Sequence, residues 1–151
     1  MDFVKNLRKI VGTRPLILPG SVVIILNDQD ELLLQHRNDG SWGLVGGLME
    51  LGESMEETAR REVKEESGLE IGKMTLIDVI SGPDYYLKLE NGDELYSVTA
   101  VYASKEVSGE IEIDQSESRN MKYFKADQLP DNMIDEYRHC LDSYFQKARL
   151  R

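Results

Sequence analysis

The sequence predicts an α/β fold in which helices pack on a mixed β-sheet. Apolar runs rich in β-branched residues recur along the chain, and other segments keep apolar residues at helical spacing. Polar turns separate these segments, and the helices are distributed among strands that are mostly joined by hairpins. The length of 151 residues is typical of one domain, so we expect a single domain over residues 1–151.

Both ends of the chain are expected to be helical. Phe3, Leu7 and Val11 are four residues apart and lie on one helix face, which predicts an N-terminal helical extension over residues 1–14. A second helix is predicted over residues 131–148. Its apolar positions are Ile134, Tyr137, Leu141, Tyr144 and Phe145.

The strands follow from apolar runs and turn residues. Residues 15–28 form a buried apolar run, and residues 31–37 are expected to return as a second strand after a polar turn. The Asn91-Gly92 pair predicts a hairpin, because both residues tolerate positive φ. The strands expected downstream cover residues 74–80, 85–90, 94–104 and 120–124.

A glycine-rich segment and an acidic helix follow the second strand. Residues 38–47 (NDGSWGLVGG) are predicted to form a loop. The helix is expected to begin at Met55, because Ser54 and Glu57 have the spacing of a capping box. Gly68 is placed to end this helix in the left-handed conformation.

The charge and the single cysteine exclude several classes of protein. A net charge of −10 argues against general binding to long nucleic acids or anionic membranes. No run approaches the roughly 20 apolar residues of a membrane span, and the N-terminal segment lacks the apolar stretch of a secretory signal. The lone Cys140 rules out an internal disulfide. We therefore expect a cytoplasmic protein with no membrane partner.

The acidic helix concentrates like charge on one face. Glu62, Glu65 and Glu66 stand at i, i+3 and i+4, where they repel one another and lie unfavourably in the helix dipole. Helix propensity does not explain them, whereas a hard divalent cation such as Mg²⁺, which prefers oxygen ligands, does. The alternative is a solvated helix face. Arg61 is expected to pair with Glu53 or Glu65.

The spacing of this segment resembles a known family signature. From Gly47 the chain reads Gly, five residues, Glu53, seven residues, Arg61-Glu62-Val63, one residue, Glu65-Glu66, one residue, Gly68-Leu69. Residues 47–69 resemble, without a mismatch, the complete box of the Nudix hydrolases, or MutT-like proteins. The resemblance implies a Nudix-type α/β/α sandwich with a mixed β-sheet. Val45 departs from the family, in which proline is common at this position.

The resemblance also implies an activity and the residues that perform it. Family members use Mg²⁺ or Mn²⁺ to hydrolyse a phosphoanhydride in a nucleoside diphosphate linked to another group. The metal ligands implied are the Gly46 carbonyl, Glu62, Glu65 and Glu66. Glu62 and Glu65 are also implied as catalytic, and the general base is either a box glutamate or an acid of a later loop, with Glu117 preferred over Glu112 and Asp114. The implied structural residues are Gly47, Glu53, Arg61 and Gly68.

The substrate contacts are open at this point. Arg37 occupies the position where relatives contact phosphate, and the alternative is a surface charge at a strand end. Trp42, Tyr85 and Tyr86 are candidates to stack on a base, and the alternative is packing in the core. An ADP-ribose-like molecule, a dinucleoside polyphosphate and a (d)NTP all fit the resemblance. A nucleotide-binding sensor without catalysis is the alternative function, and a homodimer is common among relatives.

Overall fold

The computed structural model describes residues 2–116 and 118–149. Three α-helices, one short 3₁₀-helix and ten strands follow one another along this part of the chain. The helices are α1 (Asp2–Val11), α2 (Met55–Ser67), η1 (Pro83–Tyr85) and α3 (Asp135–Arg149). The strands are β1 (Leu16–Ile25), β2 (Leu32–Arg37), β3 (Trp42–Gly43), β4 (Val45–Leu48), β5 (Glu70–Ile71), β6 (Thr75–Ile80), β7 (Tyr86–Lys88), β8 (Glu94–Ser104), β9 (Val107–Ser108) and β10 (Ser118–Phe124).

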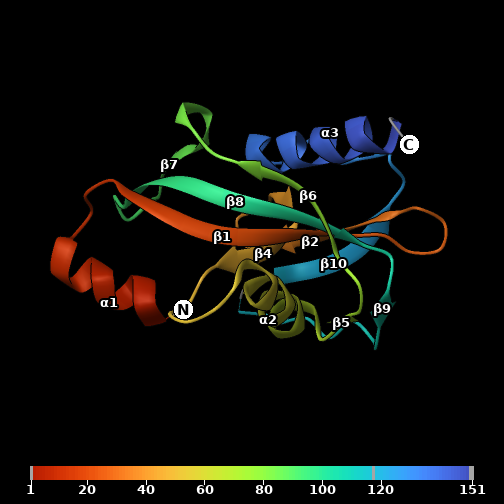
Figure 1. Ribbon diagram of the computed structural model, residues 1–151, viewed down its shortest axis with the longest axis horizontal. Helices are drawn as coiled ribbons and strands as arrows, with labels where there is room; N and C mark the ends of the chain where they lie inside the picture. Colours follow the sequence, from red (N-terminus) through yellow and green to blue (C-terminus); the bar gives the residue numbers. More distant parts are fainter. Residues whose placement is uncertain (1, 117, 150–151) are drawn as a thin grey trace.

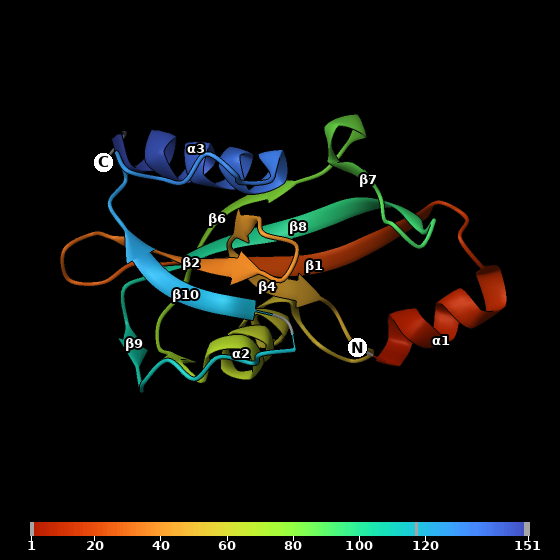
Figure 2. The same ribbon diagram turned by 180° about the vertical axis from the view of Figure 1, so that it is seen from behind.

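The predicted mixed sheet is confirmed, and it forms the centre of the molecule. Its strand order is β4-β1-β8-β6, with β7 also paired to β8. Strands β1 and β8 run parallel over ten residue pairs, from Leu16–Leu95 to Ile25–Ser104, and the other pairs are antiparallel. Helix α3 covers one face and α2 lies on the other, while α1 extends beside the start of β1 (Figures 1 and 2). This arrangement is the α/β/α sandwich expected from the resemblance.

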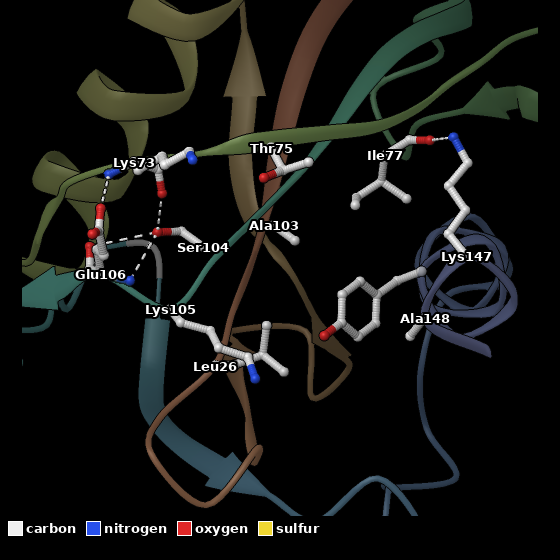
Figure 3. A pocket seen from close by; sticks show the side chains of 11 residues that line it. Leu26, Lys73, Thr75, Ile77, Ala103, Ser104, Lys105, Glu106, Lys147 and Ala148 are labelled. Atoms are coloured by element: carbon white, nitrogen blue, oxygen red, sulfur yellow. Dashed lines mark hydrogen bonds between the residues drawn. The ribbon is translucent and has the colours of Figure 1, made fainter. Parts of the chain in front are cut away.

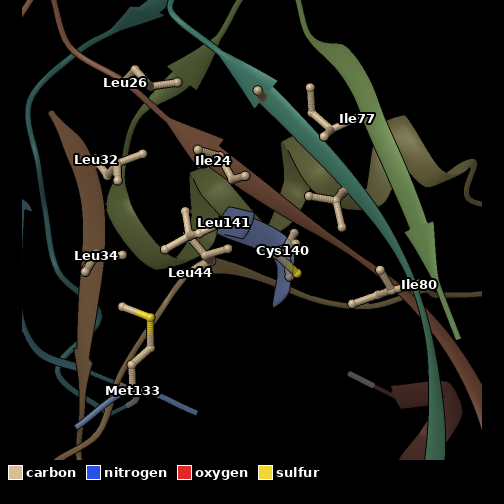
Figure 4. Close-up of a cluster of buried hydrophobic side chains, with 13 residues drawn as sticks. Ile24, Leu26, Leu32, Leu34, Leu44, Ile77, Ile80, Met133, Cys140 and Leu141 are labelled. Carbon is tan, nitrogen blue, oxygen red and sulfur yellow. The ribbon is translucent and has the colours of Figure 1, made fainter. Parts of the chain in front are cut away.

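Two apolar clusters fill the space on either side of the sheet. The cluster under α3 includes Ile24, Leu34 and Leu141, all 2% exposed or less (Figure 4). The cluster under α2 includes Ala59 and Val63, which lie about one helical turn apart on the same face of α2. Burial of these side chains holds both helices against the sheet.

The second strand does not form the hairpin suggested by its turn. The isolated bridge Leu26–Leu32 and a hydrogen bond from the Asn27 amide to the Glu31 carbonyl close the turn, but β2 lies between β10 and β3 in a separate three-stranded sheet. Successive residues Leu33 and Leu34 face the two different apolar clusters, so β2 is buried on both sides. This double burial explains why β2 joins the interior.

The segment predicted as a loop over residues 38–47 contains β3 and the start of β4. Strand β4 pairs with β1 through Gly46–Val22 and Gly47–Ser21. A Cβ on Gly46 would lie 2.2 Å from the Ser21 carbonyl oxygen, so glycine here serves close backbone approach. Glycine composition alone indicated a loop, and that prediction was wrong for these residues.

Helix α3 begins four residues later than the predicted range. The Trp42 amide donates to the Asn132 carbonyl at 2.8 Å, and Met133 forms a parallel bridge with Trp42. These contacts involve residues 132 and 133 outside a helix, and the helix begins at Asp135. No helix in the described part of the chain is long and apolar enough to cross a bilayer.

Removing apolar volume from the cluster under α3 should destabilise the fold. We expect Leu34→Ala to lower the free energy of unfolding by about 2–5 kcal/mol, because Leu34 is fully buried and its deletion leaves a cavity. Leu89→Ala, at a side chain that is 46% exposed, should change it by less than about 0.5 kcal/mol. Urea unfolding measures both variants, and equal losses would contradict this account of the core.

Candidate active site

A cleft of about 570 Å³ brings together side chains from both sheets, α2 and α3. One wall carries the acidic residues of α2 and the glycines of β4, and another carries residues of β2, β8 and α3. Its lining includes Ser21, Gln35, Arg37, Gly46, Gly47, Glu62, Glu65, Glu66, Leu87, Leu95, Ser97, Thr99, Ser116, Glu136 and Tyr137. The cleft therefore combines anionic, cationic and apolar groups.

The ends of α2 confirm the predicted capping, and they fix the direction of its acidic face. The Ser54 hydroxyl accepts a hydrogen bond from the Glu57 amide at 3.0 Å, and Gly68 adopts φ = +76°. Glu62 and Glu66 are only 7% and 5% exposed, whereas the Glu65 side chain is 58% exposed. Two of the three carboxylates are therefore held inside the cleft rather than on a solvated helix face.

The two glycines of β4 make room for these carboxylates. A Cβ on Gly47 would lie 2.4 Å from the Glu62 carboxyl carbon, so any larger residue would displace Glu62. The Gly46 amide donates to Glu66 Oε2 at 3.2 Å. The close approach of β4 to α2 thus explains why positions 46 and 47 are both glycine.

Arg61 and Glu53 connect α2 to the preceding loop through two hydrogen-bonded contacts. Arg61 Nε lies 2.5 Å from Glu53 Oε2, and an Nη2 donor lies 2.9 Å from Oε1. The same Nη2 donates to the Leu48 carbonyl at 3.0 Å, and the Glu50 amide donates to Glu53. The Arg61 guanidinium lowers the pKa of Glu53 to about 2. This geometry agrees with the structural role implied for both residues.

Arg61 also supplies positive charge to the acidic face. Its Nη1 lies 2.9 Å from Glu62 and 3.3 Å from Glu65. Among residues 2–116 and 118–149, no three His, Cys, Asp or Glu side chains already form a metal-binding group. Glu62 and Glu65 are turned toward Arg61, and the exposed Glu65 contact is of the weak kind that a cation can replace. The donor set is all oxygen, so these residues fit Mg²⁺ or Mn²⁺ once the two carboxylates turn from Arg61.

Arg37 lines the cleft from the end of β2. Its guanidinium donates to the Tyr137 hydroxyl and lies 5.2 Å from that ring centre. Burial raises the pKa of Tyr137 to about 12, so the hydroxyl stays protonated. Arg37 Nε is buried and has no hydrogen-bond partner among residues 2–116 and 118–149. Gly43 permits this packing, because a Cβ there would lie 2.6 Å from the Tyr137 ring.

The three aromatic candidates for base stacking lie outside the residues that line the cleft. The Trp42 ring stacks on His36 at 4.3 Å and contacts Phe124 edge-on. Tyr85 packs against the cluster under α3 and meets His139. Tyr86 hydrogen-bonds Glu94 on the surface. Packing accounts for the positions of Trp42 and Tyr85, and the contact with Glu94 accounts for that of Tyr86.

The structure adds residues that the sequence did not indicate. Glu136 and Tyr137 enter the cleft from α3, and Ser97 and Thr99 enter from β8. Leu95, Ser97 and Thr99 are two residues apart and lie on one buried face of β8. Two small polar residues on the buried face of an otherwise apolar strand are a sequence signal that could have indicated a polar cleft here. Glu117 lies outside the described residues, although Ser116 lines the cleft.

A second cavity, of about 450 Å³, lies between β6, the end of β8 and the end of α3 (Figure 3). Lys73, Lys105 and Lys147 line it together with apolar side chains, and Glu106 is its only acidic lining residue. Lys105 pairs with Asp30, and Lys147 donates to the Ile77 carbonyl. None of its lining residues belongs to the segment 47–69, whereas the first cleft is lined by Gly47, Glu62, Glu65 and Glu66 of that segment.

The depressed pKa of Glu53 should make the fold sensitive to acid. The pKa of Glu53 is about 2 in the folded protein and 4.5 in the unfolded chain. Between these two values the unfolded chain therefore binds more protons than the folded protein does. The Arg61 contact therefore stabilises the fold above pH 4.5, and this contribution is lost as the pH falls from about 4.5 to 2. We expect Glu53→Gln to lower the free energy of unfolding at pH 7 by at most about 3 kcal/mol.

The comparison that checks this is urea unfolding of parent and variant between pH 7 and pH 2. The difference between them should shrink in the acid range, and a constant difference would contradict the prediction. Glu56→Gln, at an exposed position of the same helix, is the matched control and should follow the parent.

Comparison with known proteins agrees with this geometry. The NUDIX domain model matches residues 17–144. The NAD-capped RNA hydrolase NudC of Vibrio vulnificus (strain CMCP6) is 30% identical over 118 residues, which cover 77% of this chain and 41% of that protein. This chain therefore spans about two fifths of the length of that relative. A Bacillus subtilis (strain 168) protein named "Putative 8-oxo-dGTP diphosphatase" is 29% identical, over 86% of this chain and 81% of its own length.

Solved structures show the same fold. The MutT NUDIX hydrolase from Burkholderia pseudomallei superposes with a TM-score of 0.73 at 28% identity, over 86% of this chain and 98% of its own. A MutT protein from Methanosarcina mazei Go1, at 17% identity, shares the fold with a TM-score of 0.71, over 89% of this chain and 97% of its own. The family model covers most of the chain and includes the cleft residues from Gly46 to Tyr137. The chain belongs to the Nudix hydrolase family.

Proposed function

We propose that this enzyme is a Mg²⁺-dependent pyrophosphohydrolase that cleaves a phosphoanhydride in a nucleoside diphosphate linked to another group. One observation carries the proposal. The oxygen-rich face of α2 and the Arg37 guanidinium line the same cleft, so groups suited to a cation and to a phosphate lie together. Mn²⁺ fits the same donor set.

The residues of the acidic segment and Arg37 have separate roles in this proposal. Gly46, through its carbonyl, and Glu62, Glu65 and Glu66 hold the metal, which when bound neutralises phosphate charge and lowers the pKa of bound water. Arg37 binds substrate phosphate, because its buried Nε still lacks an acceptor. Glu53 and Arg61 keep the loop and α2 in register. Water adds to one phosphorus, the bond to the bridging oxygen breaks, and the general base takes the proton.

The substrate class is a small nucleotide derivative. The printed names of the Vibrio and Bacillus relatives refer to NAD-capped RNA and 8-oxo-dGTP, both of which contain nucleoside phosphates. ADP-ribose-like molecules, dinucleoside polyphosphates and (d)NTPs share the bond to be cleaved. The net charge of −10 disfavours a long RNA as the main substrate. The cytoplasmic location and the homodimer stay predictions.

The alternative is a nucleotide sensor that binds without turnover. Every carboxylate of the box is present, and two of them are held inside the cleft. A sensor does not need this set, so hydrolysis is the proposal that uses all the residues observed.

Loss of one box carboxylate should separate turnover from folding. We expect Glu66→Gln and Glu62→Gln to lower kcat with Mg²⁺ by at least about 100-fold, because each removes a charged metal ligand. Glu56→Gln removes the same charge from an exposed position of α2 and should retain parental kcat. Release of monophosphate from the three substrate types measures turnover, and urea unfolding checks the fold. Parental activity in both cleft variants would overturn the metal assignment.

The assignment of Glu117 as the general base has its own test. If Glu117 takes the proton from water, Glu117→Gln should remove the acidic limb of the profile of kcat/KM against pH and lower the plateau by about 100-fold or more. Glu110→Gln, at an exposed position of the same segment, is the control and should keep the parental profile. A Glu117→Gln profile identical to that of the parent would exclude this residue as the base and leave Glu112, Asp114 and the box glutamates as candidates.

A further inference from the structure

Glu136 forms a second polar group inside the cleft, away from the acidic face of α2. Its Oε1 accepts hydrogen bonds from the Ser97 hydroxyl at 2.7 Å and the Thr99 hydroxyl at 3.2 Å. Both donors are 6% exposed, and all three residues line the cleft. Two buried hydroxyls that donate to one carboxylate oxygen fix the orientation of this carboxylate.

The sheet order separates this group from the proposed metal site. Ser97 and Thr99 lie on β8, which is two strands away from β4, with β1 between them. Thr99 is paired with Gly20, and Gly20 is paired with Leu48. Two strand spacings correspond to about 10 Å. A ligand with phosphates at β4 and α2 therefore extends its nucleoside toward Glu136.

The surroundings of Glu136 suit a flat, partly apolar group. Leu87 and Leu95 are paired on neighbouring strands and line the same cleft, as does Tyr137, which follows Glu136 on α3. Among the residues that the structure describes, none donates to Glu136 Oε2, whereas Oε1 already accepts two hydrogen bonds. An ionised carboxylate only accepts hydrogen bonds, so the group it recognises must present donors.

We propose that Glu136 recognises the base, and that it selects a guanine-type edge. Guanine presents two adjacent donors, N1–H and the 2-amino group, to a single acceptor. The amino group of adenine or cytosine can donate to a carboxylate, but it stands beside an acceptor nitrogen rather than a second donor, and uracil and thymine offer only N3–H between two carbonyls. Guanine alone therefore places two adjacent donors against Glu136. The inference rests on the proposed function for the presence of a nucleotide, but it concerns specificity rather than hydrolysis.

Binding of three diphosphates tests this directly. Calorimetry with Mg²⁺ should give a dissociation constant for GDP that is roughly 10- to 100-fold lower than for IDP, which lacks only the 2-amino group, and for ADP. Glu136→Gln should abolish this preference, because its amide can still accept from Ser97 and Thr99 at Oε1 but presents NH₂ in place of Oε2. Asp135→Asn removes the same charge from the same helical turn at an exposed position and should keep the preference.

Equal binding of the three diphosphates by the parent, or a guanine preference that Glu136→Gln leaves intact, overturns the proposal. Equal weakening of all three by Glu136→Gln, together with weaker binding of 2′-deoxy-GDP by the parent, assigns Glu136 to the ribose and also overturns it. A Glu136-dependent guanine preference without hydrolysis of any nucleotide would refute the proposed function and leave this inference standing. Hydrolysis without the preference would do the reverse.

Discussion

The contact between Arg61 and Glu53 is the constraint on which the geometry of the cleft depends. It joins the second turn of α2 to the loop that leaves β4, and the Leu48 carbonyl and the Glu50 amide are held by the same two side chains. Because β4 carries the glycines that touch Glu62 and Glu66, this contact sets the distance between strand and helix. A planar guanidinium that donates in two directions suits this task better than a lysine would, since it also reaches Glu62 and Glu65.

The charge of Arg61 also offsets repulsion within the acidic face of α2. Three carboxylates on neighbouring turns repel one another, and two of them are nearly buried. Arg61 offsets part of this repulsion, while a hydrogen bond from the Gly46 amide assists Glu66. A divalent ion would supply more charge than one guanidinium, so Glu62 and Glu65 could exchange Arg61 for the ion proposed above while the Glu53 contact remains. The proposed metal ligands and the structural contact to Arg61 therefore involve different carboxylates.

Local patterns predicted the parts of the fold that depend on nearby residues. Ser54, Glu57 and Gly68 indicated both ends of α2, and the Arg61–Glu53 contact spans only eight residues. Contacts between distant residues were not predictable in this way. The membership of β2 in a second sheet depends on β10, about 85 residues later, and the start of α3 depends on a bridge between Trp42 and Met133. The prediction of a loop at residues 38–47 was wrong for the strand residues in this range. Glycine occupies positions 46 and 47 because the backbone approaches Ser21 and Glu62 closely there, and glycine composition alone does not reveal such an approach.

One end of the cleft is built from neighbouring residues of the sequence, and the other end is built from distant ones. The acidic face and its glycines come from one continuous stretch, residues 46–66, so a short motif suffices to define the groups proposed to act on phosphate. The opposite end is assembled from β8 and α3, where Ser97 and Glu136 are 39 residues apart, and the Arg37–Tyr137 contact spans 100 residues. Residues of that end can change without disturbing α2, because they touch neither Glu53 nor Arg61. Such an arrangement would allow one reaction centre to serve different nucleosides, with the motif identifying the family and the side chains of α3 and β8 selecting the substrate in the way proposed above.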